Sequence, residues 1–214
     1  MAIIKRGILG GFSKKIGNIV GTSWKGIAVM KSLPLSVANP RTAGQVTQRN
    51  AFKSVSQFAS EILVSLIIPL MNRFAIQMSG FNLFIQKNAE NFDENGIIDP
   101  SLLTFGTGKL GDTPITSTTC DPTTNALSAN FSSVLDNSFK LSTDKAYLML
   151  VRLSDNFIGF QGVVAQTRAT GAVGGIMSNE ILDGDECALY LVFLRADGTL
   201  VGNTAYTPVT ATDS

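Results

Sequence analysis

Histidine is missing from this chain of 214 residues. Its absence removes the side chain that most often serves as a general base and that commonly binds metals. The chain also has no Gly-x-Ser-x-Gly turn, no Walker A lysine loop and no zinc-ligand spacing. The glycine-rich run at 7–11 lacks the strand and helix that flank a phosphate-binding loop. These absences predict a protein that is not an enzyme and needs no cofactor and no metal.

Aspartate and glutamate are missing from the first 60 residues, and Glu61 is the first acid. Nine of the 17 basic residues lie in that stretch, so its formal charge is +9. The rest of the chain contains the other eight basic residues and all 16 acids, so its formal charge is −8. A basic arm on an acidic body can bind an anionic partner or the acidic body of another copy. The candidate partner-binding residues are Lys5, Arg6, Lys14, Lys15, Trp24, Lys25, Lys31, Arg41 and Arg49.

Charged residues are scarce in the whole chain, at 15% against about 25% in a typical soluble protein. One interpretation is that partners cover part of the surface. The other is a secreted or phage-type β protein with a polar, uncharged surface. Composition leaves both interpretations open.

Cysteine and long apolar runs are also scarce. Cys120 and Cys187 are far apart and form no C-x-x-C pair, which favours buried free thiols over a disulfide. The longest apolar run, at 62–71, contains Ser65 and Pro69 and is too short to span a bilayer. Glycines and lysines interrupt the N-terminus, so no signal peptide is expected. We therefore expect a protein made in the cytoplasm, with no membrane partner.

Two loops carry acidic clusters that could bind calcium, which takes six to eight oxygen ligands. Neither cluster has the full pattern of a calcium-binding loop, so solvated turn residues are the preferred interpretation. The clusters are Asp93, Glu94 and Asp99 in one loop, and Asp183, Asp185 and Glu186 in the other.

Three regions follow one another along the chain. Residues 1–40 are predicted to form a basic extended arm with a β-hairpin, whose strands lie near 19–24 and 27–30 and whose turn lies at Lys25-Gly26. Residues 41–95 are predicted to form a helical hairpin. Apolar residues at three- and four-residue steps indicate a helix over 41–68 that Pro69 ends or kinks, and a second helix near 71–86 that Gly80 weakens. The aromatic face of this helical hairpin is expected to pack on the rest of the molecule.

Residues 100–214 are predicted to form an Ig-like or fibronectin-like β-sandwich, which makes the fold class α+β. Runs 147–151 and 190–194 indicate central strands buried on both faces. The seven expected strands lie near 102–106, 126–131, 146–153, 157–164, 174–178, 188–194 and 199–206.

Trp24 is the only tryptophan and lies in the basic arm. Three interpretations remain open for it. Its ring could stack on a nucleic-acid base, anchor the arm in a pocket of a neighbouring subunit, or pack on its own helical hairpin. The basic residues are spread too thinly for a nucleic-acid tail, and the interleaved Gly and β-branched residues suit strand addition.

The N-terminal pattern resembles a family of uncharacterised proteins from Bacteroidota and their phages. The resemblance rests on Gly17-Asn18-Ile19-Val20-Gly21-Thr22-Ser23-Trp24-Lys25-Gly26, Ser32-Leu33-Pro34, Asn39-Pro40-Arg41-Thr42, Gln45, Gln48-Arg49 and Phe52. The layout Asn-Pro-Arg-Thr-x-x-Gln-x-x-x-Arg-x-x-Phe also resembles a motif of phage structural proteins. The resemblance implies a structural role and no reaction. Thr42 is a candidate helix cap, and Arg41 and Arg49 lie near one helix face, where they could clamp carboxylates.

The expectation is a non-enzymatic virion or assembly protein of a bacteriophage, in its head, neck or tail, whose partners are itself and other virion proteins. The arm would dock on neighbouring subunits. Two alternatives remain: a nucleic-acid-binding protein that uses the arm, and a surface adhesin or glycan-binding sandwich.

Overall fold

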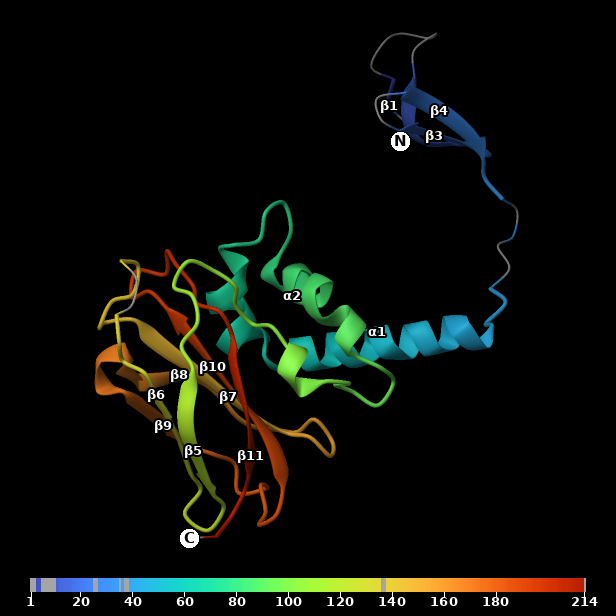
Figure 1. The fold of residues 1–214 in the computed structure, drawn as a ribbon. Coiled ribbons are helices and arrows are strands. Elements are labelled where there is room, and N and C mark those ends of the chain that lie inside the picture. Colours follow the sequence, from blue (N-terminus) through green and yellow to red (C-terminus); the bar gives the residue numbers. More distant parts are fainter. Residues whose placement is uncertain are drawn as a thin grey trace. The chain divides into compact units, whose positions relative to one another are not determined.

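The structure is a computed structural model that describes residues 3–4, 11–24, 27–34, 36, 39–135 and 138–213. The chain divides into two compact units, Met1–Thr42 and Ala43–Ser214. We call the first the arm unit and the second the body (Figure 1).

The arm unit is a four-stranded antiparallel sheet in the order β1-β2-β3-β4. The predicted hairpin is confirmed: β3 pairs with β4 from Ile19↔Ser32 to Trp24↔Ile27. Its turn residues, Lys25 and Gly26, lie outside the described residues. The strands are β1 (Ile3–Ile4), β2 (Phe12–Ile16), β3 (Ile19–Trp24) and β4 (Ile27–Ser32).

Helices open the body. The helix predicted over 41–68 is α1 (Ala43–Glu61), followed by the π-helix η1 (Leu63–Asn72), and the two axes meet at 94°. The break therefore comes at Ile62, and Pro69 lies inside η1 instead of ending a helix. In the described part of the chain, no single helix is long and apolar enough to cross a membrane, and only this bent pair meets the requirement, by length and composition alone.

The second helix begins later than the predicted start near residue 71. It is α2 (Gly80–Asn88), and Ser79 caps it by accepting a hydrogen bond from the Asn82 N–H. Gly80 marks its start: a side chain there would collide with the backbone of Asn72, whose Oδ1 accepts the Gly80 N–H at 3.0 Å. Short 3-10 turns follow at η2 (Ala89–Asn91) and η3 (Pro100–Leu102).

Seven strands form two antiparallel sheets, ordered β11-β10-β7-β8 and β5-β6-β9, an arrangement compatible with a β-sandwich. The predicted strands near 126–131, 146–153, 157–164, 174–178 and 188–194 are present with small shifts. The strands are β5 (Ile115–Asp121), β6 (Ala126–Phe131), β7 (Lys145–Arg152), β8 (Ile158–Thr167), β9 (Ala172–Ile176), β10 (Glu186–Leu194) and β11 (Ala205–Thr210).

Two strand predictions were wrong, and one strand was not predicted. Residues 102–106 form no strand, because the Phe105 and Gly106 N–H groups donate to the Thr204 hydroxyl instead of a neighbouring strand. The last strand is Ala205–Thr210, later than predicted. Strand β5 was missed because its Thr- and Ser-rich sequence has no apolar run; it lies at an edge of its sheet.

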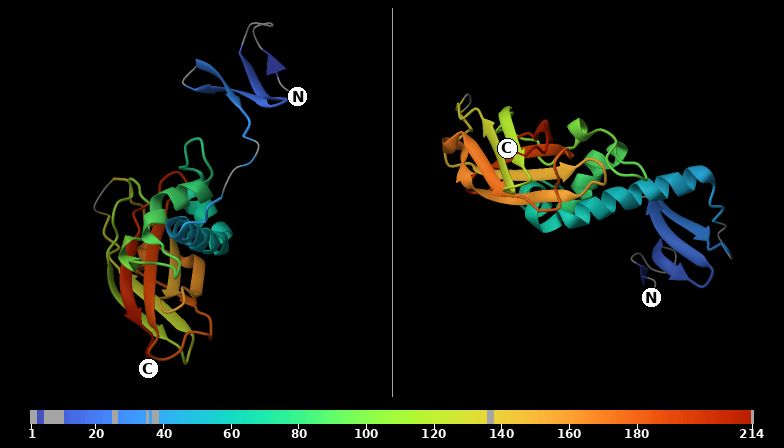
Figure 2. Two further views of the ribbon diagram at one scale, coloured as in Figure 1. Left: turned by 90° about the vertical axis from the view of Figure 1, so that its right-hand side faces the viewer. Right: turned by 90° about the horizontal axis from the view of Figure 1, so that it is seen from below.

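The four-stranded sheet is the middle layer of the body, with the helices on one face and the three-stranded sheet on the other (Figures 1 and 2). Side chains of β7 and β10 alternate between two cores. Met149 and Tyr190 pack with the helices, while Leu148 and Leu189 pack against the other sheet. This confirms that 147–151 and 190–194 are buried on both faces.

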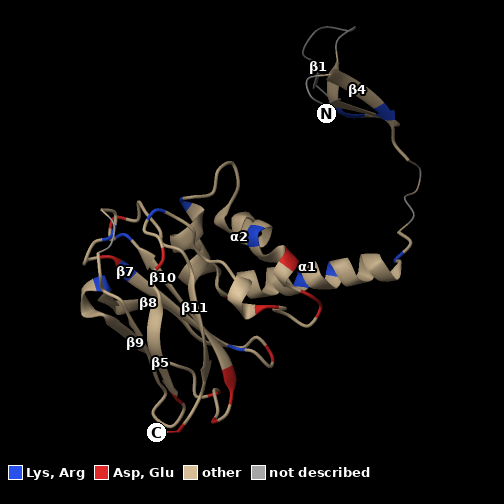
Figure 3. Ribbon diagram, viewed as in Figure 1, with Lys and Arg blue, Asp and Glu red and all other residues tan. Residues whose placement is uncertain are grey.

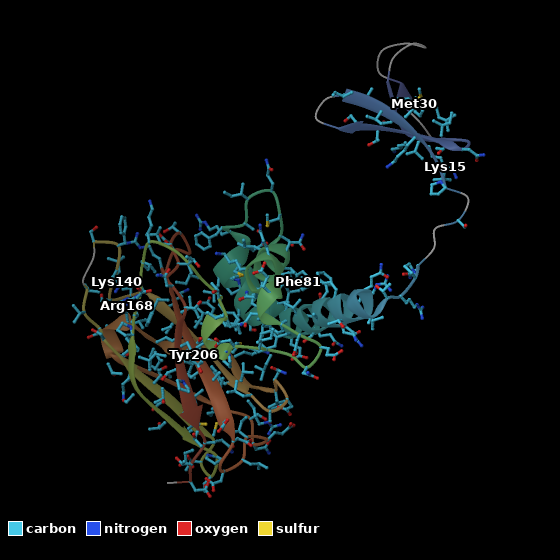
Figure 4. All side chains as sticks on the ribbon, turned by 45° about the vertical axis from the view of Figure 1, so that its right-hand side comes forward. Lys15, Met30, Phe81, Lys140, Arg168 and Tyr206 are labelled. Atoms are coloured by element: carbon cyan, nitrogen blue, oxygen red, sulfur yellow. The ribbon has the colours of Figure 1, made fainter. Side chains whose placement is uncertain are left out.

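A chain of ring contacts joins the helices to the middle sheet, as expected for the aromatic face. Phe58 stacks on Phe84 at 6.3 Å, Phe84 on Phe105 at 5.7 Å, and Phe105 meets Tyr190 edge-on at 5.3 Å. Figure 4 shows Phe81 on α2 and Tyr206 on β11 at this junction. The residues predicted as a helical hairpin thus share one core with the strands.

Candidate functional site

The structure spreads the nine predicted partner-binding residues over several elements. Lys5, Arg6 and Lys25 lie outside the described residues. Trp24 ends β3, where its backbone pairs with Ile27. The exposed residues are Lys14 and Lys15 on β2, Lys31 on β4, Arg41 before α1, and Arg49 on α1.

One predicted arrangement was wrong. Arg41 and Arg49 were expected near one face of a helix, but α1 begins at Ala43 and Arg41 has a left-handed backbone with φ 47°. Arg41 therefore lies outside the helical repeat. Lys14 also has a positive φ, 78°, which is uncommon for a residue other than glycine.

Two of the predicted lysines share a face of the arm sheet. Lys15 pairs with Val20, and Val20 pairs with Lys31, so the three residues form one row across β2, β3 and β4. Directly paired residues point to the same side of a sheet. Val29 and Ile27 follow Lys31 on this side at two-residue steps and are exposed. We call this surface, Lys15, Val20, Ile27, Val29 and Lys31, the arm face.

The other side of the arm sheet is also exposed. Met30 and Ile16 lie on it, and Figure 4 labels Met30 and Lys15 on the two sides. Gly21 is the exception, because the ring and carbonyl of Phe12 occupy the space of a side chain. Among the described residues, both buried apolar clusters belong to the body. A small sheet without a core is marginally stable alone and suits association with a partner.

In the body, α1 projects beyond the sheets (Figure 2), and its first eight residues are exposed. Phe52 belonged to the predicted apolar face, yet 55% of its surface is exposed. Shallow hollows of about 420 Å³ and 550 Å³ lie on its two sides. The outer side of α1 is thus an uncovered surface with an aromatic residue at its centre.

A larger hollow, about 640 Å³, lies beside α1. Its first wall is the α1 stretch from Asn50 to Glu61. Its second wall comes from two loops, the one after η2 with Glu94 and Asn95, and the turn between β7 and β8 with Asp155 and Asn156. We call this hollow the α1 groove.

The α1 groove is acidic. Three acids line it, Glu61, Glu94 and Asp155, and only one lysine among its lining residues, Lys53, opposes their charge. Arg152 binds the Asp155 carboxylate at 2.7 Å and lowers its pKa to about 2, so that this charge is present at every physiological pH. In the ribbon of Figure 3, acidic positions are coloured on several loops of the body, and basic positions on the arm strands, on α1 and elsewhere on the body.

Hydrogen bonds hold the second wall in place. Asn156 accepts the Ile97 N–H at 3.1 Å and donates to the Asn95 carbonyl at 3.0 Å, which ties the two loops together. Gly96, with φ 127°, packs so tightly on Asn156 that a side chain would not fit. Asn50 spans the groove and donates to the Glu94 carboxylate at 3.3 Å. The groove is therefore formed before any partner arrives.

The sequence contains weak signals for this groove. Asn95-Gly96 is a turn signal, and Asn156 follows Asp155 in the turn after a central strand. Nothing local shows that these two turns meet each other and α1.

The two acidic loops considered for calcium have other roles. Asp185 accepts hydrogen bonds from Arg152 and from the Leu182 N–H. Asp99 caps η3 by accepting from Ser101. No group of three or more Cys, Asp or Glu side chains that could hold a metal occurs within the described ranges.

A buried ion pair in the body has a structural role that the sequence did not indicate. Arg168 and Asp144 are both fully buried and bind each other at 3.0 Å. Arg168 also donates to the Thr113 hydroxyl at 2.8 Å and stacks on the Phe193 ring at 4.0 Å. Lys140, nearby in Figure 4, donates to the Asp112 carbonyl. This cluster is closed to partners.

The chain belongs to DUF6266, a family of unknown function, whose model matches residues 11–208. The match covers residues 11–42 of the arm unit and 43–208 of the body, in agreement with the expected membership of an uncharacterised family. No curated protein matches the chain.

Proposed function

We propose that the protein is a non-enzymatic structural or assembly protein of a bacteriophage virion, and that it docks on neighbouring subunits through its basic arm. The observation that carries the proposal is the arm face. It combines Lys15 and Lys31 with exposed Ile27 and Val29 on a sheet that has no buried apolar cluster in its described part. Such a sheet gains stability by binding another surface.

The proposal includes an immunoglobulin-like or fibronectin-like body. The order of its strands supports this: counted from β5 to β11, strands one, two and five form one sheet, and strands seven, six, three and four form the other. Sandwiches of this kind serve as rigid modules on many surfaces, so the fold itself names no function.

Assignment to a head, neck or tail, and to a phage of Bacteroidota, rests on the resemblance of the 17–52 region to proteins from that source. Opposite charges on arm and body would set the register of neighbouring subunits and exclude wrong partners more than they add affinity.

The test is incorporation into particles. We expect mass spectrometry of purified virions to detect the wild-type chain, and the variant Lys14→Glu/Lys15→Glu/Lys31→Glu to be incorporated about tenfold less. The matched control, Lys87→Glu/Lys109→Glu/Lys145→Glu, makes the same change of charge at exposed positions of the body and is expected to be incorporated normally. Absence of the wild-type chain from particles, or equal incorporation of both variants, would refute the proposal.

Nucleic-acid binding by the arm is the second candidate, favoured by the row of Lys15 and Lys31 in an acid-free unit. It requires affinity that falls steeply with salt, because phosphate contacts release counterions. A gel-shift assay at about 50 mM salt decides it: a shift that the arm variant abolishes favours this candidate, and no shift removes it. The adhesin alternative needs aromatic side chains exposed on loops, yet Tyr147 and Tyr190 are buried in strands β7 and β10.

A further inference from the structure

We propose that the α1 groove of one copy is the binding site for the arm face of a second copy. This inference rests on the proposed function, and it names both the partner and the surface. The partner is a second copy because this chain itself carries both complementary surfaces.

Charge complementarity is the first argument. The arm is acid-free and presents Lys15 and Lys31 in one row. The groove carries three carboxylates, of which Glu61 and Glu94 form no ion pair with any residue the structure describes. Two lysines of the arm face are therefore matched by two carboxylates that form no ion pair with a described residue. Contacts between two arms would instead bring like charges together, which costs free energy.

Apolar contact is the second argument. Ile27 and Val29 of the arm face are 62% and 38% exposed, and Phe52 beside the groove is 55% exposed. Salt bridges on a surface contribute little by themselves, so a stable contact needs apolar area as well. One of the hollows beside Phe52 also contains Glu61, so exposed apolar area adjoins one of the groove carboxylates, as aliphatic residues adjoin lysines on the arm face.

Pre-organisation is the third argument. Asn156 and Gly96 fix the loop that carries Glu94, and Asn50 holds its carboxylate. A partner then binds without ordering the groove, which lowers the entropic cost of association.

The experiment is a charge swap in the full-length chain, measured by sedimentation equilibrium at low and high salt. We expect the wild type to self-associate. The groove variant Glu61→Lys/Glu94→Lys and the arm variant Lys15→Glu/Lys31→Glu are each expected to weaken association by about tenfold, because each turns two attractions into repulsions. Combining all four substitutions in one chain should restore much of the affinity. The control Asp183→Lys/Glu186→Lys makes the same change of charge at exposed positions outside the groove and should have no effect.

A cross-linking measurement identifies the occupant. Carbodiimide joins an amine directly to a carboxylate, and mixing ¹⁵N-labelled with unlabelled chain separates links between copies from links within one. We expect links from Lys15 or Lys31 to Glu61 or Glu94 between copies.

Each contrary result has its own meaning. Links only within one chain, or a wild type that stays monomeric, would overturn the inference by showing that the occupant is not a second copy. Loss of association in the arm variant but not in the groove variant would also overturn it, yet leave the proposed docking by the arm intact. Normal association of Lys15→Glu/Lys31→Glu, together with normal incorporation of Lys14→Glu/Lys15→Glu/Lys31→Glu into virions, would overturn both proposals. Unchanged circular dichroism spectra show that the variants remain folded.

Discussion

Arg168 is among the largest fully buried side chains that the structure describes, and it is charged. Its partners are the carboxylate of Asp144, the hydroxyl of Thr113 and the face of Phe193. Asp144 also accepts the Leu141 N–H and so fixes the entry to β7. A buried charge is tolerated only when such partners replace water. Loss of one partner is therefore expected to lower the free energy of unfolding by far more than the intact ion pair contributes to it.

Replacing Arg168 by methionine leaves the Asp144 carboxylate buried without its cation. We expect Arg168→Met to lower the free energy of unfolding by about 3–5 kcal/mol. The same substitution at Arg73, which is exposed and donates to the Asp197 carbonyl, should cost less than about 1 kcal/mol. Urea denaturation measures both. Similar losses for the two variants would show that the buried pair has no special role.

Among the elements, those with a regular local pattern were predictable and those formed by distant contacts were not. The pairing of β3 with β4 was predictable because β-branched residues lie on both sides of a Lys-Gly turn signal in the sequence. The start of α2 was missed because it depends on a bond between Gly80 and Asn72, which only the folded chain brings together. The break after Glu61 follows from packing of η1 in the helical core, and Pro69 suggested a later position.

The candidate site shows the same division. The charge of the arm could be predicted, because it depends only on counting residues. The row of Lys15 and Lys31 needed the strand register, and the groove needed Asn156 to meet Asn95 from a distant turn. Such side-chain bonds between loops have no sequence period.

The bond between these two loops can be tested by substitution. Asn156 has a left-handed backbone, φ 59°, so Asn156→Gly keeps the backbone and removes both side-chain bonds. We expect a loss of about 2 kcal/mol and faster hydrogen exchange in residues 95–97. Asn125, φ 54°, is the control, because its Oδ1 accepts no hydrogen bond from any described residue. Asn125→Gly should change stability little, and equal effects at the two positions would contradict the proposed bond.

The whole molecule divides unequally between its two units. The body has a sheet with a buried apolar core on each face. The described part of the arm unit contributes no residue to either core. Stability should therefore reside in the body and association in the arm.

Removal of residues 1–42 tests this division. We expect the fragment 43–214 to unfold cooperatively, with a thermal midpoint within about 4 °C of that of the full chain. In a protein of this size, such a shift corresponds to a change of about 1 kcal/mol in the free energy of unfolding. Ile62→Ala in the same fragment, at a fully buried position, should cost about 2–5 kcal/mol and lower the midpoint much further. Calorimetry measures both. A fragment that fails to unfold cooperatively would show that the arm is part of the folding unit.

The uneven charge of the first 60 residues also determines how proteases cut the chain. Trypsin, which cuts after lysine and arginine, has nine sites within residues 1–60, whereas an enzyme that cuts after aspartate or glutamate has none there. The first acid, Glu61, is also the last residue of α1. Digestion at acidic residues therefore leaves β2, β3, β4 and α1 joined in one piece, while it cuts the rest of the body at up to 16 positions.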